Sequence, residues 1–573
     1  MLDKDKFHMM LNRPDILNRI RHNPEISVLV IGGGINGIAT FRELALQGID
    51  VLLVEKSDFC AGASAGSSHM LHGGIRYLEN GEFRLVREAL HERNLMIENA
   101  PHYAKPLPTT IPIFKWASGL LNAPLKFVRL SSKPAERGAL VIKIGLMMYD
   151  FFVRKHQIMP RHQVNLKAKA LEKFPHLNPE IVCTATYYDG FMAYPERLCL
   201  ELLLDAEAAN EKAVALNYVS AVHGAGEAVT LKDEVSGEQF EVKPALVVNA
   251  AGPWIDFANR AMQQETRFIG GTKGSHLVVD HPELLKAAAG NEIFFENNDG
   301  RIVLILPFLD RVMLGTTDIP IDDPDQAECT EDEVDYILHL VKKVFPTIHV
   351  DRSHIVFKFT GVRPLPASDA ATPGQISRDH SIRVTEAGNG VNYPIFSLVG
   401  GKWTTQRAFG EQVADQLLQR LGLSRKVDTK HRAFGGGKNY PKSDVEQRRW
   451  IQQLQEKAGI SAERAQTLFD RYGTYAEAIA AFCTAEQDYP LENMPDFSQR
   501  EIIFLARNEK VVHVTDILLR RTLLGMLGKL NRKLVQEIAT VMVEEMGWTP
   551  LDVQREVALA VETVRVKHNM ELV

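Results

Sequence analysis

The sequence predicts an α/β protein with a helical region at its C-terminal end. Apolar strand patterns run directly into glycine-rich turns and helices at residues 27–48 and 395–421. Short alternating strand patterns dominate residues 267–318, which is typical of an antiparallel sheet. From residue 431 onward helical patterns prevail. The 573 residues are too many for one hydrophobic core, so several domains are expected.

The composition is that of an ordinary globular enzyme, with 45% hydrophobic and 24% charged residues. The net charge of −6 gives no indication of a nucleic-acid partner. No segment reaches about 18 consecutive apolar residues, so we expect no transmembrane helix. The polar residues 1–24 do not resemble a signal peptide. The five cysteines contain no CxxC pair, which argues against a zinc site or a disulfide framework and favours a reducing compartment.

The first glycine-rich turn has the spacing of a dinucleotide-binding motif. Residues 27–31 form an apolar strand pattern, and Gly32, Gly34 and Gly37 then fit G-x-G-x-x-G. These glycines allow a tight turn, a close approach to a pyrophosphate, and close packing of helix on strand. The helix that follows points its positive end at the phosphates. Glu55 ends the next strand about 20 residues on, where a carboxylate binds ribose hydroxyls. The motif predicts a Rossmann-like site for FAD or NAD.

Two further segments end in small residues that could lie against a cofactor. An apolar strand ends at Ala251-Gly252, and small residues let the backbone come close to a bound group. A second strand, 395–399, is followed by Gly400-Gly401 and a helix from about Thr404. A helix N-terminus there would stabilise negative charge by roughly 0.3–1 kcal/mol. The alternatives are a plain core strand for the first segment and an ordinary loop for the second.

Six short motifs, taken in order and spacing, resemble one known family. They are residues 67–78, 249–254, 273–276, 315–318, 361–365 and 400–405. The chain resembles the FAD-dependent, aerobic-type glycerol-3-phosphate dehydrogenases, strongly over about residues 25–410 and more loosely beyond. The resemblance implies FAD rather than NAD, oxidation of sn-glycerol 3-phosphate to dihydroxyacetone phosphate, and quinone as electron acceptor. It also implies a cytoplasmic protein bound peripherally to the inner face of the membrane.

Two alternatives keep the fold and change the chemistry. A branch of the family passes electrons to oxygen and is therefore a glycerol-3-phosphate oxidase. An amine or amino-acid oxidase of similar fold would need fewer cations at the substrate pocket, because a carboxylate carries less charge than a phosphate dianion. A further possibility is a flavin-binding protein without turnover. The cationic residues in the motifs argue against it.

We expect three domains from these patterns. The Rossmann-like FAD-binding domain is discontinuous and comprises residues 25–100, 180–265 and 375–425. An antiparallel-sheet substrate domain comprises residues 101–179 and 266–374, and a helical C-terminal domain comprises residues 431–573. The C-terminal helices carry no catalytic constellation, and a role in packing or in a homo-oligomer is a hypothesis.

The substrate site follows from the charge of a phosphate monoester. A dianion needs several cationic donors, for which arginine supplies a planar fork and lysine a point charge. Arg76, Arg363 and Lys402 lie in three separate glycine-flanked motifs, and the resemblance places them around the substrate. Tyr77 could add a hydroxyl donor. Taken singly, each arginine is more often a surface ion-pair partner.

Oxidation of a secondary alcohol also needs a proton acceptor. The C2 hydrogen leaves as hydride to N5 of FAD, and a neutral histidine suits the hydroxyl proton because its pKa lies near working pH. His276 is the first candidate, and orientation of the substrate is its alternative role. His72 is the second, with flavin contact or a structural role as its alternatives. Arg363 could also hold the developing oxygen charge.

The expected FAD contacts come from the glycine-rich turns and the motif that begins at Ser67. They are Gly32, Gly34, Gly37, Glu55, Ser67, Ser68, His72, Gly73, Gly74, Ala251, Gly252, Gly401, Lys402 and Thr404. No metal site is expected.

Residues 105–161 have a local basic excess that opposes the overall charge. Ten lysines and arginines stand there among apolar runs, with Glu136 and Asp150 as the acidic residues between them. A basic amphipathic segment can lie in a bilayer interface and attract anionic lipid. The alternative is a solvated basic face over a helical core.

Overall fold

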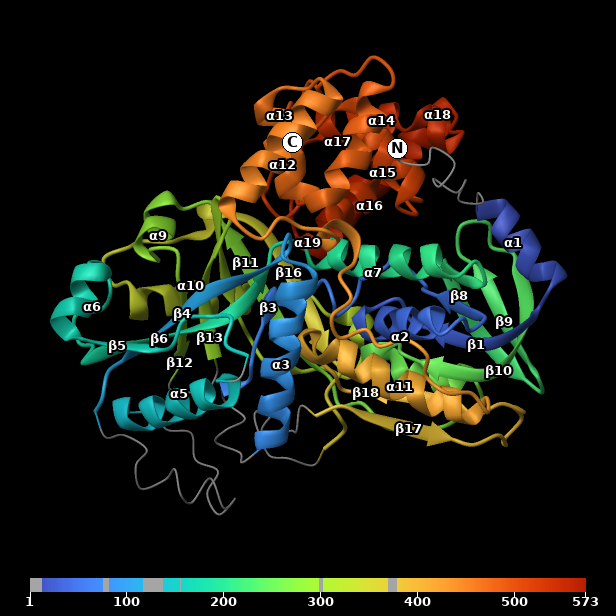
Figure 1. Ribbon diagram of the computed structural model, residues 1–573, viewed down its shortest axis with the longest axis horizontal. Helices are drawn as coiled ribbons and strands as arrows, with labels where there is room; N and C mark the ends of the chain where they lie inside the picture. Colours follow the sequence, from blue (N-terminus) through green and yellow to red (C-terminus); the bar gives the residue numbers. More distant parts are fainter. Residues whose placement is uncertain are drawn as a thin grey trace.

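The computed structural model describes residues 13–75, 82–116, 138–154, 156–297, 302–368 and 379–572. Two sheets lie side by side, and a helical C-terminal domain lies above them in Figure 1. The mixed architecture confirms the predicted fold class: a Rossmann-like domain, a largely antiparallel second sheet and a helical C-terminal domain.

The first sheet has the parallel core of a nucleotide-binding fold. Its order is β17 (Ser381–Thr385), β18 (Ile395–Val399), β10 (Gln239–Asn249), β1 (Glu25–Ile31), β2 (Val51–Val54) and β7 (Ala213–Leu216). β1 runs parallel to both β10 and β2. Side chains alternate across this sheet, so Val28 and Val30 join one core and Leu29 and Ile31 the other. Burial on both faces explains why these strands read as continuous apolar runs.

Helices cover both faces of this sheet. α2 (Ile35–Leu46), α7 (Pro195–Ala209) and α11 (Gln406–Arg420) pack on one face. α1 (Arg13–His22), α8 (Ile255–Ala261) and the meander of β8 (Val219–Ala225) and β9 (Ala228–Asp233) pack on the other. The long strand β10 joins the meander to the core, because residues 239–242 pair with β9 and residues 243–249 pair with β1.

The second sheet is largely antiparallel. Its order is β15 (Ile319–Pro320), β11 (Thr272–Val279), β14 (Arg311–Gly315), β13 (Ile302–Phe308), β12 (Glu292–Glu296), β4 (Ala104–Ile113), β6 (Cys183–Met192) and β3 (Met70–Leu71). β16 (Ile355–Arg363) pairs with β11, and β5 (Gln163–Leu166) pairs with β6. The helices packed on it are α3 (Phe83–Asn99), α5 (Ala139–Val153), α6 (Lys167–Lys173), α9 (Pro282–Ala287) and α10 (Glu331–Val344). α10 begins at a capping box formed by Thr330 and Glu333, a pattern that is visible in the sequence.

The strand β6 lies in a different domain from the one we expected. We expected residues 180–265 in the FAD-binding domain, but β6 belongs to the second sheet. The cause is its antiparallel pairing with β4, which runs without interruption from Ala104 opposite Met192 to Ile113 opposite Cys183. Such pairing between distant segments leaves no local sequence signal.

The expectation about cysteines also needs a correction. Cys60 and Cys199 form a disulfide although 139 residues separate them. Cys60 follows β2 and Cys199 lies on α7, and both are buried in the same core. A search for CxxC spacing could not find this pair, because the packing of α7 beside the nucleotide-binding turn brings the two residues together.

The C-terminal domain is joined to the rest of the chain by buried ion pairs. Its helices are α12 (Asp444–Ala458), α13 (Ala462–Tyr472), α14 (Ala476–Thr484), α15 (Gln499–Asn508), α16 (Val514–Asp516), α17 (Arg532–Val541), α18 (Val543–Met546) and α19 (Pro550–His568). Glu509 accepts two hydrogen bonds from Arg197 of α7, at 2.8 and 2.9 Å. Arg521 makes a similar fork to Asp58. No helix of the described residues is both long enough and apolar enough to cross a bilayer.

Candidate active site

A cavity of about 650 Å³ lies where the two sheets meet. The carboxyl ends of β1, β2, β10 and β18 form one side, which is where open parallel sheets bind ligands. β11 and β16 of the second sheet contribute His276 and Arg363 to the other side. The volume falls within the range of about 300–1,000 Å³ that is usual for cofactor and ligand sites.

The cavity brings together most of the residues that the sequence nominated. Its lining includes Gly32, Gly34, Glu55, Ser67, Ser68, His72, Ala251, Gly252, His276, Arg363, Gly401, Lys402 and Thr404. Gly37, Gly73 and Gly74 lie near it in the chain but do not form its wall. Arg76 and Tyr77 lie outside the described residues.

The glycine turn has the shape that a dinucleotide requires. Gly32 has a φ of 110°, and a Cβ on Gly37 would stand 1.9 Å from the Gly32 carbonyl oxygen. The turn therefore brings α2 close enough for its N-terminus to face a bound pyrophosphate. Asn36 Oδ1 is buried at the cavity and has no hydrogen-bond partner among the described residues. A buried acceptor of this kind suits a donor group of a bound cofactor.

Glu55 lies at the end of β2, as the ribose-binding motif predicts. Its Oε2 accepts a hydrogen bond of 2.7 Å from the Gly33 amide, and its Oε1 accepts one of 2.9 Å from the Ser57 amide. Burial raises the pKa of this carboxyl group. These contacts tie the strand end to the glycine turn and hold the carboxylate at the cavity wall.

Arg363 is held from behind by the loop that follows β14. Its guanidinium donates to Asp318 Oδ1 at 3.2 Å, to Thr316 Oγ1 at 3.1 Å and to the Thr317 carbonyl at 3.1 Å. The guanidinium lies over Gly274, where a Cβ would come within 2.3 Å of a guanidinium nitrogen. The fork is therefore fixed in orientation before any ligand binds.

His276 is enclosed between a ring and a backbone. Its imidazole stacks on Phe359 at 4.8 Å, with planes 7° apart, and Gly315 lies against the opposite side. His276 Nε2 shares a hydrogen bond of 2.8 Å with Ser68 Oγ. Burial, followed by the charges of Arg363 and His69, lowers the pKa of His276 to about 3. This imidazole is therefore neutral across the physiological pH range.

His72 has the opposite electrostatic environment. Its Nδ1 lies 3.2 Å from Asp189 Oδ2, and its carbonyl oxygen accepts a hydrogen bond from Thr404 Oγ1. Burial alone would lower the pKa of His72, but the hydrogen bond and the charge of Asp189 outweigh it and raise the pKa above the ordinary value. The two histidines thus differ sharply in basicity.

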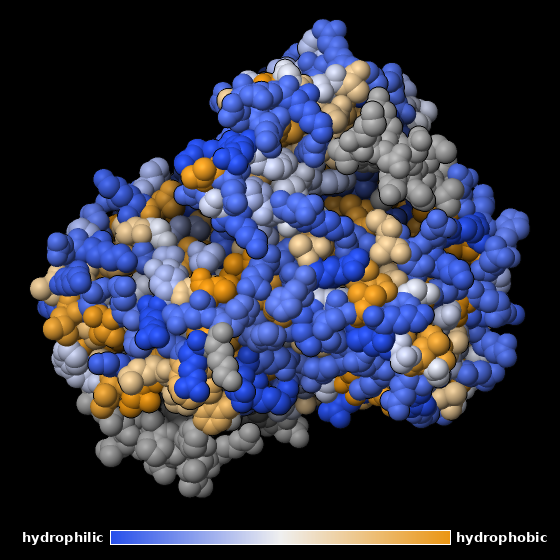
Figure 2. All heavy atoms as spheres, in the orientation of Figure 1, coloured by the Kyte–Doolittle hydropathy of each residue, from blue (hydrophilic) through white to orange (hydrophobic). Residues whose placement is uncertain are grey.

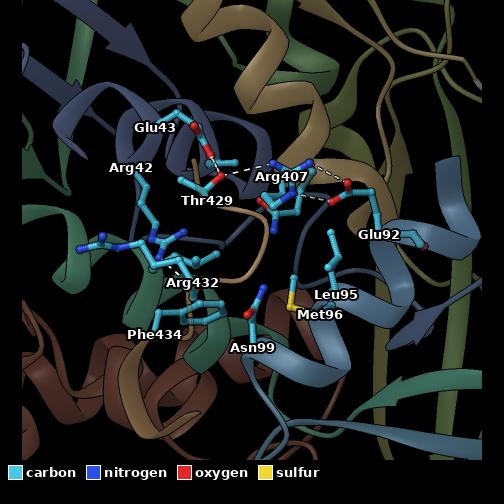
Figure 3. Close-up of a pocket in the computed structure, with 14 residues that line it drawn as sticks. Arg42, Glu43, Glu92, Leu95, Met96, Asn99, Arg407, Thr429, Arg432 and Phe434 are labelled. Carbon is cyan, nitrogen blue, oxygen red and sulfur yellow. Dashed lines mark hydrogen bonds and ion pairs between the residues drawn. The ribbon is translucent and has the colours of Figure 1, made fainter. Parts of the chain in front are cut away.

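A second, much smaller cavity of about 20 Å³ lies between α2, α3, α11 and the chain near Phe434. Figure 3 shows Arg407 facing Glu92, with Thr429 beside Glu43. Arg407 donates two hydrogen bonds to the Glu92 carboxylate, at 2.7 and 2.8 Å, and the positive charge of Arg407 is therefore already paired. The space could hold a water molecule, which needs about 10–15 Å³, but no substrate.

Comparison with known proteins identifies the family. Residues 27–407 match the family described as FAD dependent oxidoreductase, and residues 427–552 match the C-terminal domain of alpha-glycerophosphate oxidase. A glycerol-3-phosphate dehydrogenase of Synechocystis is 35% identical, over 94% of this chain and 95% of that protein. This chain belongs to the FAD-dependent glycerol-3-phosphate dehydrogenases. The resemblance carried by the sequence motifs is thereby confirmed, and FAD is the cofactor.

Other glycerol-3-phosphate dehydrogenases also match over most of this chain. The glycerol-3-phosphate dehydrogenase of Pseudomonas tolaasii is 31% identical, over 87% of this chain and 92% of that protein. The mitochondrial enzyme of Mus musculus is 28% identical, over 95% of this chain and 74% of that protein. The crystal structure of a glycerol-3-phosphate dehydrogenase from Bacillus halodurans, complexed with FAD, superposes with a TM-score of 0.75 at 22% identity. It covers 96% of this chain and 97% of that one, and shows the same fold.

The cavity of about 650 Å³ is also lined by residues that the sequence did not nominate. Asn36 and Trp254 lie inside motifs that had been singled out, so their position was a usable signal. Asp325 and Lys567 come from segments without a motif. Lys567 belongs to α19, and the C-terminal domain thus contributes a residue to the cavity for which the sequence offered no signal.

Proposed function

We propose that this protein oxidises sn-glycerol 3-phosphate to dihydroxyacetone phosphate and that a membrane quinone receives the two electrons. The observation that carries the proposal is one cavity joining the dinucleotide turn to Arg363, Lys402, His72 and His276. FAD, when bound there, supplies the N5 atom that accepts the C2 hydrogen as hydride. Two relatives, 35% and 31% identical to this chain, are named glycerol-3-phosphate dehydrogenases, which supports glycerol 3-phosphate as the substrate.

Arg363 and Lys402 are the phosphate-binding cations of this proposal. Arginine forks match a phosphate bidentately, and such charge-assisted hydrogen bonds are roughly twice as strong as neutral ones. Asp318 and Thr316 hold the fork of Arg363, so little side-chain freedom is lost when a phosphate binds. Arg76 and Tyr77 are proposed as further donors on the strength of the motif in which they stand.

We assign the proton acceptor to His72 rather than to His276. A general base works best when its pKa lies near the working pH. Burial and Arg363 hold the pKa of His276 near 3, which makes it a weak base. Asp189 raises the pKa of His72, which also lines the cavity. His276 and Ser68 then orient the substrate hydroxyl, the alternative role already considered for His276.

In this proposal, α5 is the part of the protein that contacts the membrane. Four large apolar side chains of this helix are 47–56% exposed: Leu140, Ile144, Met147 and Phe151. Their spacing of four, three and four residues puts them on one face of the helix. Figure 2 shows apolar surface at the lower left, where Figure 1 places α5. A helix with such a stripe and flanking basic residues such as Lys143 and Arg154 suits the bilayer interface, where quinone is available.

The first experiment is an anaerobic titration of the purified protein with sn-glycerol 3-phosphate. The oxidised-flavin band near ~450 nm should bleach as substrate is added. A flavin that stays oxidised would remove this substrate and make amines or amino acids the next class to try. The bleached protein is then mixed separately with a water-soluble quinone and with oxygen. Fast reoxidation by quinone supports the proposed acceptor, whereas faster reoxidation by oxygen would contradict it.

A further inference from the structure

A buried carboxylate lies behind the cavity wall and outside every sequence motif. Asp189 on β6 is 1% exposed. Its Oδ2 contacts His72 Nδ1 at 3.2 Å, and its Oδ1 accepts hydrogen bonds from the Gly73 amide at 3.0 Å, Arg93 at 2.9 Å and Tyr149 at 2.5 Å. Besides the His72 loop, two elements therefore supply partners to this carboxylate of β6: α3 with Arg93 and α5 with Tyr149.

The charge state of this cluster follows from its contacts. Burial opposes ionisation of Asp189, but the hydrogen bond from His72 and the charge of Arg93 outweigh it and keep the pKa of this carboxyl below its ordinary value. An ionised carboxylate has no proton to donate, so His72 Nδ1 must carry the hydrogen of that bond. The neutral imidazole is thereby held in the tautomer whose Nε2 accepts a proton.

The same cluster also fixes the backbone beside His72. The Gly73 amide donates to Asp189, and a Cβ on Gly73 would stand 2.0 Å from the Tyr149 hydroxyl. Thr404 Oγ1 donates to the His72 carbonyl. Two further charges act on His72: Glu292 of β12 raises its pKa, and Lys402 lowers it. Asp189 of β6 thus holds the ring of His72, and Thr404 just before α11 holds its carbonyl.

We propose that Asp189 is a positioning residue of the reaction, which holds His72 in its proton-accepting tautomer and is itself held by Arg93 and Tyr149. The proposal rests on the proposed function, in which His72 is the base. The substrate O–H bond breaks and its proton goes to His72 Nε2. The electron pair left on the oxygen forms the C2=O bond as the C2 hydrogen leaves with both electrons of its bond as hydride, which FAD would accept. Asp189 stays ionised throughout and stabilises the positive imidazolium, as carboxylates do for paired histidines.

The test is Asp189→Asn in the FAD-loaded protein, measured as kcat against pH. kcat should fall about 10²–10⁴-fold, the range a general base contributes, while KM changes little. The acidic limb of the kcat profile should also move to lower pH, because the residue that raises the pKa of His72 is gone. kcat is used because the substrate phosphate itself titrates near pH ~6 and would affect kcat/KM.

Asp205→Asn is the matched control. Asp205 is also a buried carboxylate paired with an arginine, Arg42, but it lies outside the cavity. Its variant should keep the wild-type kcat and pH profile. Retention of the flavin, measured by absorbance, separates loss of turnover from loss of cofactor. If Asp189→Asn does not fold, Tyr149→Phe removes only one donor to the carboxylate and should give a smaller fall in kcat.

The outcomes distinguish this proposal from the one on which it rests. Normal kcat and an unmoved limb in Asp189→Asn, or in Tyr149→Phe where that is the variant that folds, would overturn the positioning role, provided that His72→Gln itself loses most of its turnover. Normal turnover in His72→Gln would instead overturn the choice of base. Failure of the wild-type flavin to bleach would overturn the proposed function itself.

Discussion

Replacement of Arg363 by alanine should cost more catalytic efficiency than any other single change to a described cation of the cavity. The fork is proposed to make two charge-assisted hydrogen bonds to the phosphate, each of about 1.5–3 kcal/mol. Their loss amounts to about 3–6 kcal/mol, or a fall of about 10²–10⁴ in kcat/KM, since about 1.4 kcal/mol corresponds to a factor of ten. Removal of Arg363 also leaves the Asp318 carboxylate without that partner, so its negative charge close to the proposed phosphate site is no longer offset. The double variant Arg363→Ala, Asp318→Asn should therefore recover part of the loss.

The assay is steady-state oxidation of sn-glycerol 3-phosphate with an artificial electron acceptor, together with the flavin content from absorbance. Arg363→Ala should retain FAD, because Arg363 comes from the second sheet and the dinucleotide turn from the first. Arg363→Lys should recover little, because a point charge cannot replace a bidentate fork. Arg383→Ala, on the exposed part of β17, is the control and should behave as wild type. A kcat/KM of Arg363→Ala within about threefold of wild type would refute the assignment.

Four further results are expected. His276→Gln should keep the acidic limb of the kcat profile, because the pKa of His276 lies near 3. His72→Gln should lose this limb, because activity in the wild type falls as the pH drops through the raised pKa of His72. The opposite pattern would make His276 the base. Glu509→Gln should lower the unfolding free energy by about 3–5 kcal/mol, because it leaves the buried charge of Arg197 without its carboxylate partner. Thermal unfolding is the measurement, and Glu562→Gln, from an exposed pair, should change little. Gly37→Ala should abolish FAD binding, measured by flavin absorbance, because its Cβ would stand 1.9 Å from the Gly32 carbonyl, whereas Gly145→Ala meets nothing within 4 Å. The double variant Ile144→Glu, Phe151→Glu should cosediment less with anionic vesicles than the wild type does. Val445→Glu changes another exposed apolar residue and is the control. Equal vesicle binding by the two variants would show that α5 is not the membrane surface.

Local signals in the sequence were sufficient for the nucleotide-binding core. The strand at residues 27–31 and the glycines that follow it predicted β1 and α2, because a buried strand and a tight turn each impose their own residue types. The strand predicted at residues 395–399 is β18 with the same bounds. The start of α10 was readable from Thr330 and Glu333, because a capping box satisfies backbone donors within one turn. The candidate site residues came from motifs of this local kind.

The tertiary structure decided what depends on contacts between distant segments. Asp189 stands 117 residues from His72, and no motif surrounds it, so its contact with that histidine could not be foreseen. The pairing of β6 with β4, the disulfide of Cys60 and Cys199, and the arrival of Lys567 at the cavity have the same origin. Sequence patterns report the conformation and burial of neighbouring residues. The identity of a long-range partner depends on how whole elements pack. Only the folded chain therefore separates His72, whose pKa is raised by Asp189, from His276, whose pKa is lowered by burial.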